Sequence, residues 1–240
     1  MSICTPPVSH APLAVACLGH NLNVLCEKPL ALTRADALRM LRAAARVGRH
    51  LLLATKFRHV PDVVRARELI TQGEIGEPVA FEIDFSSKVD MSERWNSRRA
   101  LAGGGVVIED SATILVSASR GLVGRIDLSW SLNTGRESFV TVYGSGGTIE
   151  VGWRGSQLRQ AGRPPVAIGT GYDKAEAHRR MLASFQALVA GDAPPWISAG
   201  ECLRTVAAVE AAYVSLRSGS WVQVDMRRAR ERRPAFEASA

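Results

Sequence analysis

Strand-like and helix-like segments alternate over the first 72 residues of this 240-residue chain. Residues 2–4 have the character of a buried strand end, and the apolar runs within 23–26 and 50–55 fit two further buried strands. Helical spacing of apolar residues predicts intervening helices over 10–18, between Thr33 and Gly48, and over 61–70. Strands that alternate with helices build a parallel sheet, so this part predicts a doubly wound α/β domain.

The pattern changes near residues 73–76, where consecutive strand-like runs replace the alternation. A largely antiparallel open sheet, and so an α+β second domain, is the expected result. We therefore expect domains at 1–72 and 73–225, followed by a basic, disordered tail at 226–240. The expected strands of the second domain are 79–85, 113–117, 124–131, 139–143 and 148–151, and the expected helices are 174–190 and 199–216.

Composition excludes several classes of protein. No apolar run approaches the roughly 20 residues of a membrane span, and the N-terminus has no signal-peptide pattern. These features predict a cytoplasmic protein without a membrane partner. The four cysteines are scattered, and the five histidines show no metal-ligand spacing, so we expect buried free thiols and no metal site.

The formal net charge of +7 has a local origin. Five arginines fall between residues 227 and 233, and the rest of the chain is nearly balanced. A nucleic-acid-binding protein needs a basic face on its folded body, preferably with interleaved aromatic residues. Because the sequence has a basic tail instead, we expect no nucleic-acid partner.

Lys28 is the first candidate for a chemical role. It follows the predicted strand at 23–26, and ligands of doubly wound sheets bind outside the carboxyl ends of the strands. A lysine at such a place can act as an acid, a base or a polariser of a carbonyl group. Pro29 would fix the backbone beside it, including through a cis peptide bond. By spacing alone, a solvated surface lysine is the alternative.

The residues around Lys28 form a longer pattern. Residues 2–10 read Ser-Ile-Cys-Thr-Pro-Pro-x-x-His, and residues 23–33 read Asn-Val-Leu-Cys-Glu-Lys-Pro-Leu-Ala-Leu-Thr. In this order the motifs resemble the Gfo/Idh/MocA family of NAD(P)-dependent sugar and polyol oxidoreductases, over most of residues 2–224. The motifs that follow are Phe57-Arg58-x-x-Pro61, Gly73-x-Ile75-Gly76, Trp95, Gly103-Gly104-Gly105, Gly124-x-Ile126-x-x-Ser129-Trp130 and Tyr143-Gly144-x-x-Gly147-Thr148-Ile149.

The resemblance implies a Rossmann domain that binds NAD or NADP, and residues 1–72 would form a partial Rossmann domain, its C-terminal part. It also implies a second domain that holds a sugar- or polyol-like substrate and forms a homo-oligomer, a dimer or a tetramer, through its sheet. Lys28 corresponds to a catalytic lysine that contacts nicotinamide and substrate. For His10 a capping or packing role stays open beside a role at the cofactor. The implied cofactor-binding residues are Thr5, Pro6, His10, Glu27, Lys28 and Pro29, and the implied substrate-binding residues are Arg58 and Trp95.

Two family features have no counterpart in the 240 residues. One is the G-x-G-x-x-G loop that binds pyrophosphate at a helix N-terminus. Gly144-Ser145-Gly146-Gly147 lies between strand-like runs and predicts a hairpin turn instead. The other is an aspartate followed four residues later by a histidine. Here Glu109 and Asp110 follow the glycines at 103–105, and Thr113 takes the place of the histidine, so we assign no catalytic histidine.

Two functions remain open at this point. In the first, the protein transfers a hydride between nicotinamide and a sugar- or polyol-like alcohol, and Lys28 orients and polarises the reacting oxygen. Glu109 or Asp110 could then stand in for the missing aspartate. In the second, the chain is a catalytically impaired fragment or paralogue that keeps only the sheet-mediated oligomerisation module.

Overall fold

The computed structural model describes residues 1–90, 110–118 and 120–224, and its contacts divide the chain into two compact units. The first unit comprises Met1–Thr55 together with the segment from Leu182 onward, and the second comprises Lys56–Met181. This division follows spatial contacts, and the expected boundary after residue 72 stays a prediction about the order of modules along the chain. The expected tail at 226–240 lies outside the described residues.

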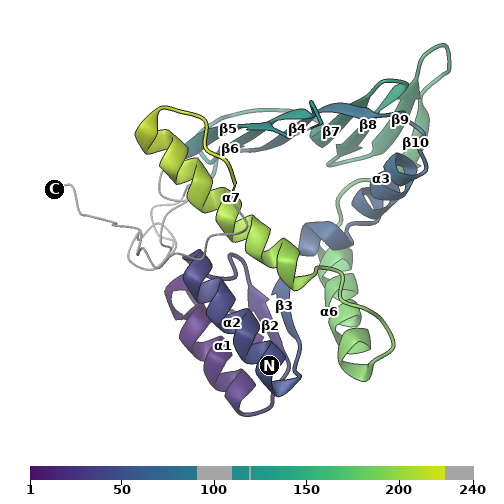
Figure 1. The fold of residues 1–240 in the computed structure, drawn as a ribbon. Helices are drawn as coiled ribbons and strands as arrows, with labels where there is room; N and C mark the ends of the chain where they lie inside the picture. The colour runs from purple at the N-terminus through teal and green to yellow at the C-terminus, as the bar shows by residue number, and fades with distance from the viewer. Residues whose placement is uncertain (91–109, 119, 225–240) are drawn as a thin grey trace. The chain divides into compact units, whose positions relative to one another are not determined.

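The first unit contains a three-stranded parallel sheet (Figure 1). Its strands are β1 (Ser2–Ile3), β2 (Val24–Glu27) and β3 (Leu51–Ala54), in that spatial order. Val24, Leu25 and Cys26 are all buried, as expected for a parallel strand covered on both faces. The predicted parallel sheet is confirmed.

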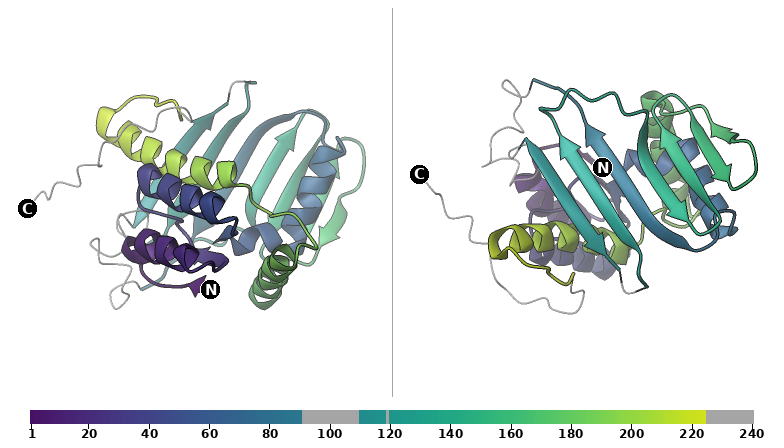
Figure 2. Two further views of the ribbon diagram at one scale, coloured as in Figure 1. Left: turned by 60° about the horizontal axis from the view of Figure 1, so that its bottom comes forward. Right: turned by 90° about the horizontal axis from the view of Figure 1, so that it is seen from above.

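Three α-helices accompany this sheet in the same unit, two of them in contact with it. They are α1 (His10–Gly19), α2 (Arg34–Val47) and α7 (Ala199–Ser218). Helix α2 packs beside α1 and also contacts α7 (Figure 2). Its ends agree with the sequence: the Thr33 side chain accepts a hydrogen bond from the backbone N–H of Asp36, and Gly48 closes the helix at a φ of 61°.

The start of α1 lacks the side-chain cap that a serine before a helix usually provides. Ser9 holds the N-cap position, but its side chain makes no capping hydrogen bond. The hydroxyl lies instead 2.7 Å from Thr5 Oγ1 and 2.8 Å from the carbonyl oxygen of Pro6. A short 3₁₀ turn, η1 (Pro7–Ser9), precedes the helix and directs the hydroxyl back toward β1. The serine thus fixes the segment after β1 rather than the helix end.

The second unit is built on a seven-stranded sheet with the order β10-β9-β8-β7-β4-β6-β5. Strands β4 and β6 pair in parallel, and every other pair is antiparallel. The largely antiparallel sheet is confirmed, and β9 and β10 are additions to the expected strands. The bounds are β4 (Pro78–Ser86), β5 (Ser111–Ser117), β6 (Val123–Ser129), β7 (Ser138–Gly144), β8 (Gly147–Gly152), β9 (Ser156–Gln160) and β10 (Val166–Gly169).

One face of this sheet carries the core of the unit. Helix α3 (Pro61–Thr71) buries Ala66 and Leu69 against Ile149, Val151 and Leu158, and a further short turn, η2 (Lys56–His59), precedes it. The predicted hairpin at 144–147 joins β7 to β8. The remaining helix, α6 (Lys174–Ala190), has the predicted bounds and contains the division between the two units.

An irregularity in β7 decides which side chains reach the core. The pairing of β7 with β8 shifts between Ser138 and Val140, which is the mark of a β-bulge. The side chain of Phe139 consequently lies on the face of the sheet that α3 covers, where it is 1% exposed. Ser138 and Thr141 lie on the other face, with their hydroxyl oxygens 3.3 Å apart.

Candidate active site

The sheet register places two predicted site segments side by side. Ile3 of β1 pairs with Cys26 of β2 in parallel, so Thr5-Pro6 and Glu27-Lys28-Pro29 both emerge at the carboxyl edge of the sheet. This is the edge where ligands of doubly wound sheets bind. The geometry therefore brings together two segments that lie about twenty residues apart in the sequence.

Lys28 is exposed at this edge. The half-buried carboxylate of Glu27 accepts a hydrogen bond from the backbone N–H of Lys28 at 3.1 Å. The bond Lys28–Pro29 is a cis peptide, one of the two forms that the sequence leaves open. The Lys28 ammonium is accessible to a ligand, and its backbone is tied to its neighbour.

His10 lies beneath the two segments. Its side chain is fully buried, with Nδ1 2.8 Å from the carbonyl oxygen of Pro29 and Nε2 2.8 Å from that of Thr5. The ring thus contacts one residue after β1 and one after β2. The packing role that the sequence leaves open is present in the structure, whereas the role of His10 at the cofactor stays a prediction.

Cys26 ends the buried part of β2, directly before Glu27 and Lys28. Burial raises the pKa of the Cys26 thiol to about 12, and the nearby Glu27 carboxylate and Cys4 add to this effect. Since the thiolate is the reactive form, Cys26 is chemically inert at neutral pH. Of the four expected buried thiols, only Cys26 and Cys202 are buried; Cys17 is half-buried and Cys4, just past the end of β1, is exposed.

Thiol labelling measures this difference directly. We expect a maleimide to modify Cys4 in the folded protein at least about 10²-fold faster than Cys26, because Cys4 is exposed whereas Cys26 is buried and burial raises the pKa of its thiol to about 12. Peptide mass spectrometry after timed labelling distinguishes the two sites. Labelling of Cys26 as fast as Cys4 would contradict the burial, and denaturation before labelling gives the matched control.

In the second unit, Arg58 lies in η2, directly after Phe57, which belongs to an aromatic cluster. Phe57 stacks on Tyr172 with ring centroids 5.0 Å apart, and the Lys56 ammonium lies 5.4 Å from the Phe57 ring centroid. His59 is buried, and its pKa is lowered by burial and then by the charge of Arg58, so it is neutral at neutral pH. The substrate-binding role of Arg58 stays a prediction. Trp95, Glu109 and the glycines at 103–105 lie outside the described residues.

Asp110 is the one described candidate for the missing aspartate. It directly precedes β5, is exposed, and has a positive φ of 61°. Its carbonyl oxygen accepts a hydrogen bond from the backbone N–H of Trp130 at 2.9 Å. This backbone role is observed, while a catalytic role for its carboxylate stays a prediction.

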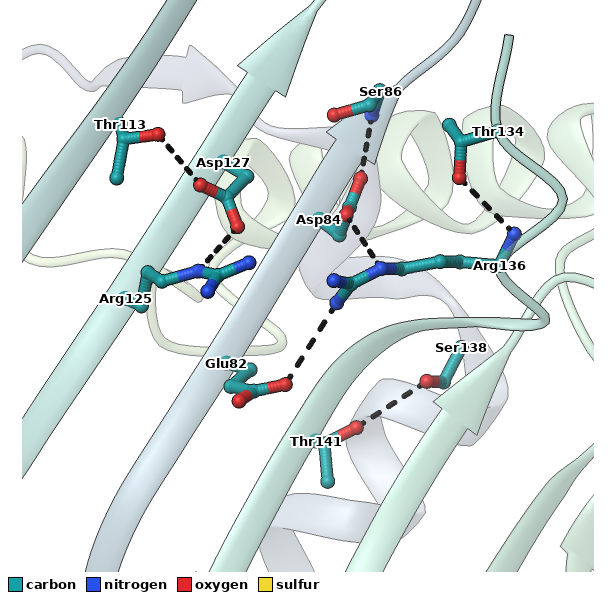
Figure 3. Close-up of polar contacts among 10 residues, drawn as sticks. All are labelled: Glu82, Asp84, Ser86, Thr113, Arg125, Asp127, Thr134, Arg136, Ser138 and Thr141. Carbon is teal, nitrogen blue, oxygen red and sulfur yellow. Dashed lines mark hydrogen bonds and ion pairs between the residues drawn. The ribbon is translucent and has the colours of Figure 1, made fainter. Parts of the chain in front are cut away.

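The face of the large sheet opposite α3 carries paired charges that the sequence analysis did not identify (Figure 3). Asp127 accepts hydrogen bonds from Arg125 Nε at 2.6 Å and from Thr113 Oγ1 at 2.8 Å. Arg136 bridges Asp84, at 3.1 Å from Nε, and Glu82, at 3.8 Å from Nη1. We call this surface the polar face. Period-two alternation in β4 and β6 was the available signal, since Glu82, Asp84, Arg125 and Asp127 occupy alternate positions.

The charges on the polar face stabilise one another. Burial raises the pKa of Asp127, but hydrogen bonds from Thr113 and Arg125 and the charges of Arg125 and Arg136 outweigh it, so the pKa is lowered. The pKa of Tyr143 is raised by burial and then by the charges of Glu82 and Glu150. The Asp127 carboxylate therefore remains ionised at neutral pH beside the Arg125 guanidinium.

Comparison with known proteins is consistent with both units. The family model for the oxidoreductase family with an NAD-binding Rossmann fold (GFO_IDH_MocA) matches residues 1–55. A D-apiose dehydrogenase of Paraburkholderia graminis is 27% identical over 273 residues, which is 93% of this chain and 72% of that protein. An inositol 2-dehydrogenase of Rubrobacter xylanophilus is also 27% identical, over 93% of this chain and 74% of its own length. The match of residues 1–55 and the similarity of these relatives over most of the chain support a Gfo/Idh/MocA-type oxidoreductase.

Solved structures of this fold support the assignment of both sheets. The aldose-aldose oxidoreductase from Caulobacter crescentus has a TM-score of 0.79 at 21% identity, covering 91% of this chain and 77% of that one. A levoglucosan dehydrogenase in complex with NADH and levoglucosan has a TM-score of 0.82 at 18% identity, covering 92% and 78%. At these identities the likeness shows the fold alone: a Rossmann sheet followed by a largely antiparallel sheet.

Two searches of the described residues gave negative results. No helix in residues 1–90, 110–118 and 120–224 is long and apolar enough to cross a bilayer. Within the same ranges, no group of three or more His, Cys, Asp or Glu side chains could hold a metal ion.

Proposed function

We propose that this protein is a dehydrogenase that uses NAD or NADP to oxidise a sugar- or polyol-like alcohol, with Lys28 as the catalytic lysine. The observation that carries the proposal is the register of β1 and β2, which places Thr5-Pro6 beside Glu27-Lys28-Pro29 at the carboxyl edge of the parallel sheet. The names of the relatives, which act on D-apiose and inositol, supply the substrate class. The cytoplasmic location expected from the sequence stays a prediction.

The residues at this edge fit the nicotinamide end of such a cofactor. Lys28 is exposed beside the half-buried Glu27, and Thr5 and Pro6 emerge next to them. A bound nicotinamide supplies the hydride acceptor. Oxidation of an alcohol would remove a hydride from its carbon, and the proton of its hydroxyl would pass to water at this exposed edge, because an ammonium cannot accept it. The Lys28 ammonium donates a hydrogen bond to that oxygen, orients it and stabilises the negative charge that develops there.

A nucleotide titration tests this proposal on the whole chain. We expect NADH or NADPH fluorescence to change saturably on binding at millimolar concentrations or below. We also expect absorbance to rise when the oxidised nucleotide is mixed with a substrate such as inositol or D-apiose. Absence of binding to either nucleotide at millimolar concentration would reject the dehydrogenase proposal for this chain and leave the oligomerisation module as its function.

We also propose that the polar face mediates assembly of a homo-oligomer. Leu115 of β5 pairs with Arg125 of β6, so it lies on the polar face, and it is 60% exposed. Val123, at the start of β6, is 51% exposed. Exposed apolar side chains beside preorganised ion pairs are typical of protein–protein interfaces.

Light scattering, which measures the mass of the oligomer, tests this proposal with a variant that adds one charge to the polar face. We expect the unmodified chain to be a dimer or tetramer and Leu115→Asp to dissociate it by at least about tenfold in dissociation constant, because an unpaired charge would enter the interface. Leu216→Asp, on an exposed position of α7, is the matched control and should leave the mass unchanged. An unmodified chain that is monomeric at high concentration would contradict the proposal, as would equal effects of the two substitutions.

A further inference from the structure

The His10 ring occupies an unusual position between two backbone acceptors. His10 is the first residue of α1, and its side chain is fully buried. Its Nδ1 lies 2.8 Å from the carbonyl oxygen of Pro29, and its Nε2 lies 2.8 Å from that of Thr5. The Pro29 contact is one residue from Lys28, and the Thr5 contact is at the neighbouring segment. A single side chain therefore spans the two segments that carry the proposed nicotinamide site.

The two contacts of the His10 ring require two N–H donors if both are hydrogen bonds. A carbonyl oxygen only accepts hydrogen bonds, and a neutral imidazole has a single N–H. In either neutral tautomer, one ring nitrogen would direct its lone pair at a carbonyl oxygen 2.8 Å away, with no proton between the two atoms. With a proton on each nitrogen, the ring donates to both oxygens in charge-assisted bonds.

Other local forces act against a charged ring. Burial removes the ring from water, and the N-terminus of α1 carries partial positive charge that disfavours a second cation nearby. Among the residues that the structure describes, the two carbonyl oxygens are the hydrogen-bond partners of the ring that offset this cost. The protonation of the ring is thus coupled to the positions of Thr5 and Pro29, because both oxygens must face it at the same time.

Ser9 strengthens the same arrangement from the other side. Its hydroxyl oxygen lies 2.7 Å from Thr5 Oγ1 and 2.8 Å from the Pro6 carbonyl oxygen. Thr5 is therefore contacted at its side chain by Ser9 and at its backbone by His10. The segment after β1 is held at several points, and the His10 contact joins it to the segment after Lys28, in which Leu30 and Ala31 are also buried.

We propose that His10 is a positioning residue for Lys28: its ring, protonated on both nitrogens, holds the segment after β1 against the Lys28-Pro29 segment. The ring does not touch the reacting atoms, since both nitrogens are occupied by backbone oxygens. The relevance to catalysis rests on the proposed dehydrogenase function, but the protonation and the connection between the segments do not.

Nuclear magnetic resonance of the ring tests the protonation without any cofactor. In long-range ¹H–¹⁵N spectra at pH 7, we expect the His10 nitrogens to have the nearly equal shifts of an imidazolium and two slowly exchanging N–H protons. The spectrum of His10→Gln identifies the signals by their loss. A His10 ring with one N–H and one unprotonated nitrogen would overturn the doubly donating arrangement.

Variants test the positioning role. We expect His10→Ala to increase amide hydrogen exchange of Thr5 and Lys28 by about tenfold or more, and to raise the NADH dissociation constant by a similar factor. His10→Gln, which keeps one side-chain donor, should recover part of both effects. The control is Leu18→Ala. Leu18 is fully buried in the same helix, and its apolar side chain cannot hydrogen-bond to either carbonyl oxygen.

The control separates positioning from general destabilisation. Both His10→Ala and Leu18→Ala should lower Tm, but only His10→Ala should affect exchange at Thr5 and Lys28 selectively. Equal exchange profiles for the two variants would overturn the positioning role. If the unmodified protein binds no nucleotide, the dehydrogenase proposal fails, and the ring spectra and the exchange data still decide the role of His10.

Discussion

Replacing Lys28 by alanine is expected to lower kcat/KM for alcohol oxidation by about 10²–10³-fold. Removing a hydrogen-bond donor that stabilises a developing oxyanion has an effect of this size. Lys28 is exposed and its backbone, not its ammonium, makes the recorded hydrogen bond with Glu27. The substitution should therefore leave Tm nearly unchanged, within about 0.5 kcal/mol of unfolding free energy. Steady-state kinetics with the purified variant, followed by absorbance of the reduced nucleotide, give the measurement.

A second lysine provides the matched control for this prediction. Lys174, the first residue of α6, is exposed and lies outside the proposed site. Lys174→Ala should keep kcat/KM within about twofold, because it changes only the surface charge. A Lys28→Ala variant that kept the activity of the control would show that the lysine has no part in the reaction.

Replacing Asp62 by alanine is expected to destabilise the protein by about 3 kcal/mol. Asp62 is 2% exposed and lies in the first turn of α3. Its Oδ2 accepts hydrogen bonds from Ser156 Oγ at 2.5 Å and from the backbone N–H of Gly171 at 2.8 Å. The carboxylate thus joins α3 to β9 and to the segment after β10, and its loss would leave two buried donors without an acceptor.

Thermal unfolding measures this effect. For a chain of this length, about 3 kcal/mol corresponds to a fall in Tm of roughly 6–12 °C. Asp62→Asn should be milder, because one amide oxygen can still accept both bonds. Asp192→Ala, at an exposed position after α6, is the control and should stay within about 0.5 kcal/mol. A Tm for Asp62→Ala equal to that of the control would show that the buried carboxylate is not stabilising.

Local signals in the sequence predicted much of the fold. Thr33 and Gly48 bound α2 because a side-chain cap and a left-handed glycine act within one helical turn. The apolar run before Glu27 predicted β2, and the parallel order of β1, β2 and β3 followed from the alternation with helices. Strands β9 and β10 were missed because their residues are largely polar or exposed, as the pattern at 156–160 shows.

The remaining differences depend on contacts between residues distant in the sequence. The parallel pairing of β4 with β6 cannot be read from either strand alone, since it requires a crossover between them. The role of Asp62 depends on Ser156 and Gly171, which follow it by about a hundred residues. Gly169 is a related case, because a Cβ at this position would overlap the Asp62 carboxylate. The residues next to Gly169 in the sequence give no indication of this close approach.

The proposed site was predictable in its residues but not in its internal contacts. The motif around Lys28 identified Thr5, Glu27 and Pro29, and the register of β1 and β2 places them at one sheet edge. The contacts of His10 with two carbonyl oxygens and of Ser9 with Thr5 depend on η1, whose geometry helical periodicity does not predict. A serine directly before a helix usually caps it, so the local sequence does not indicate the contact of Ser9 with Thr5.

Amide chemical-shift mapping with NADH or NADPH tests the central claim most directly. Spectra of the isotope-labelled chain, recorded with increasing nucleotide, report where the nicotinamide lies. We expect the amide chemical shifts of Thr5, Glu27 and Lys28 to change saturably, and those of the polar face, such as Asp84 and Asp127, to stay unchanged. Saturable shifts elsewhere, with Thr5, Glu27 and Lys28 unaffected, would contradict a nicotinamide site at the carboxyl edge of β1 and β2.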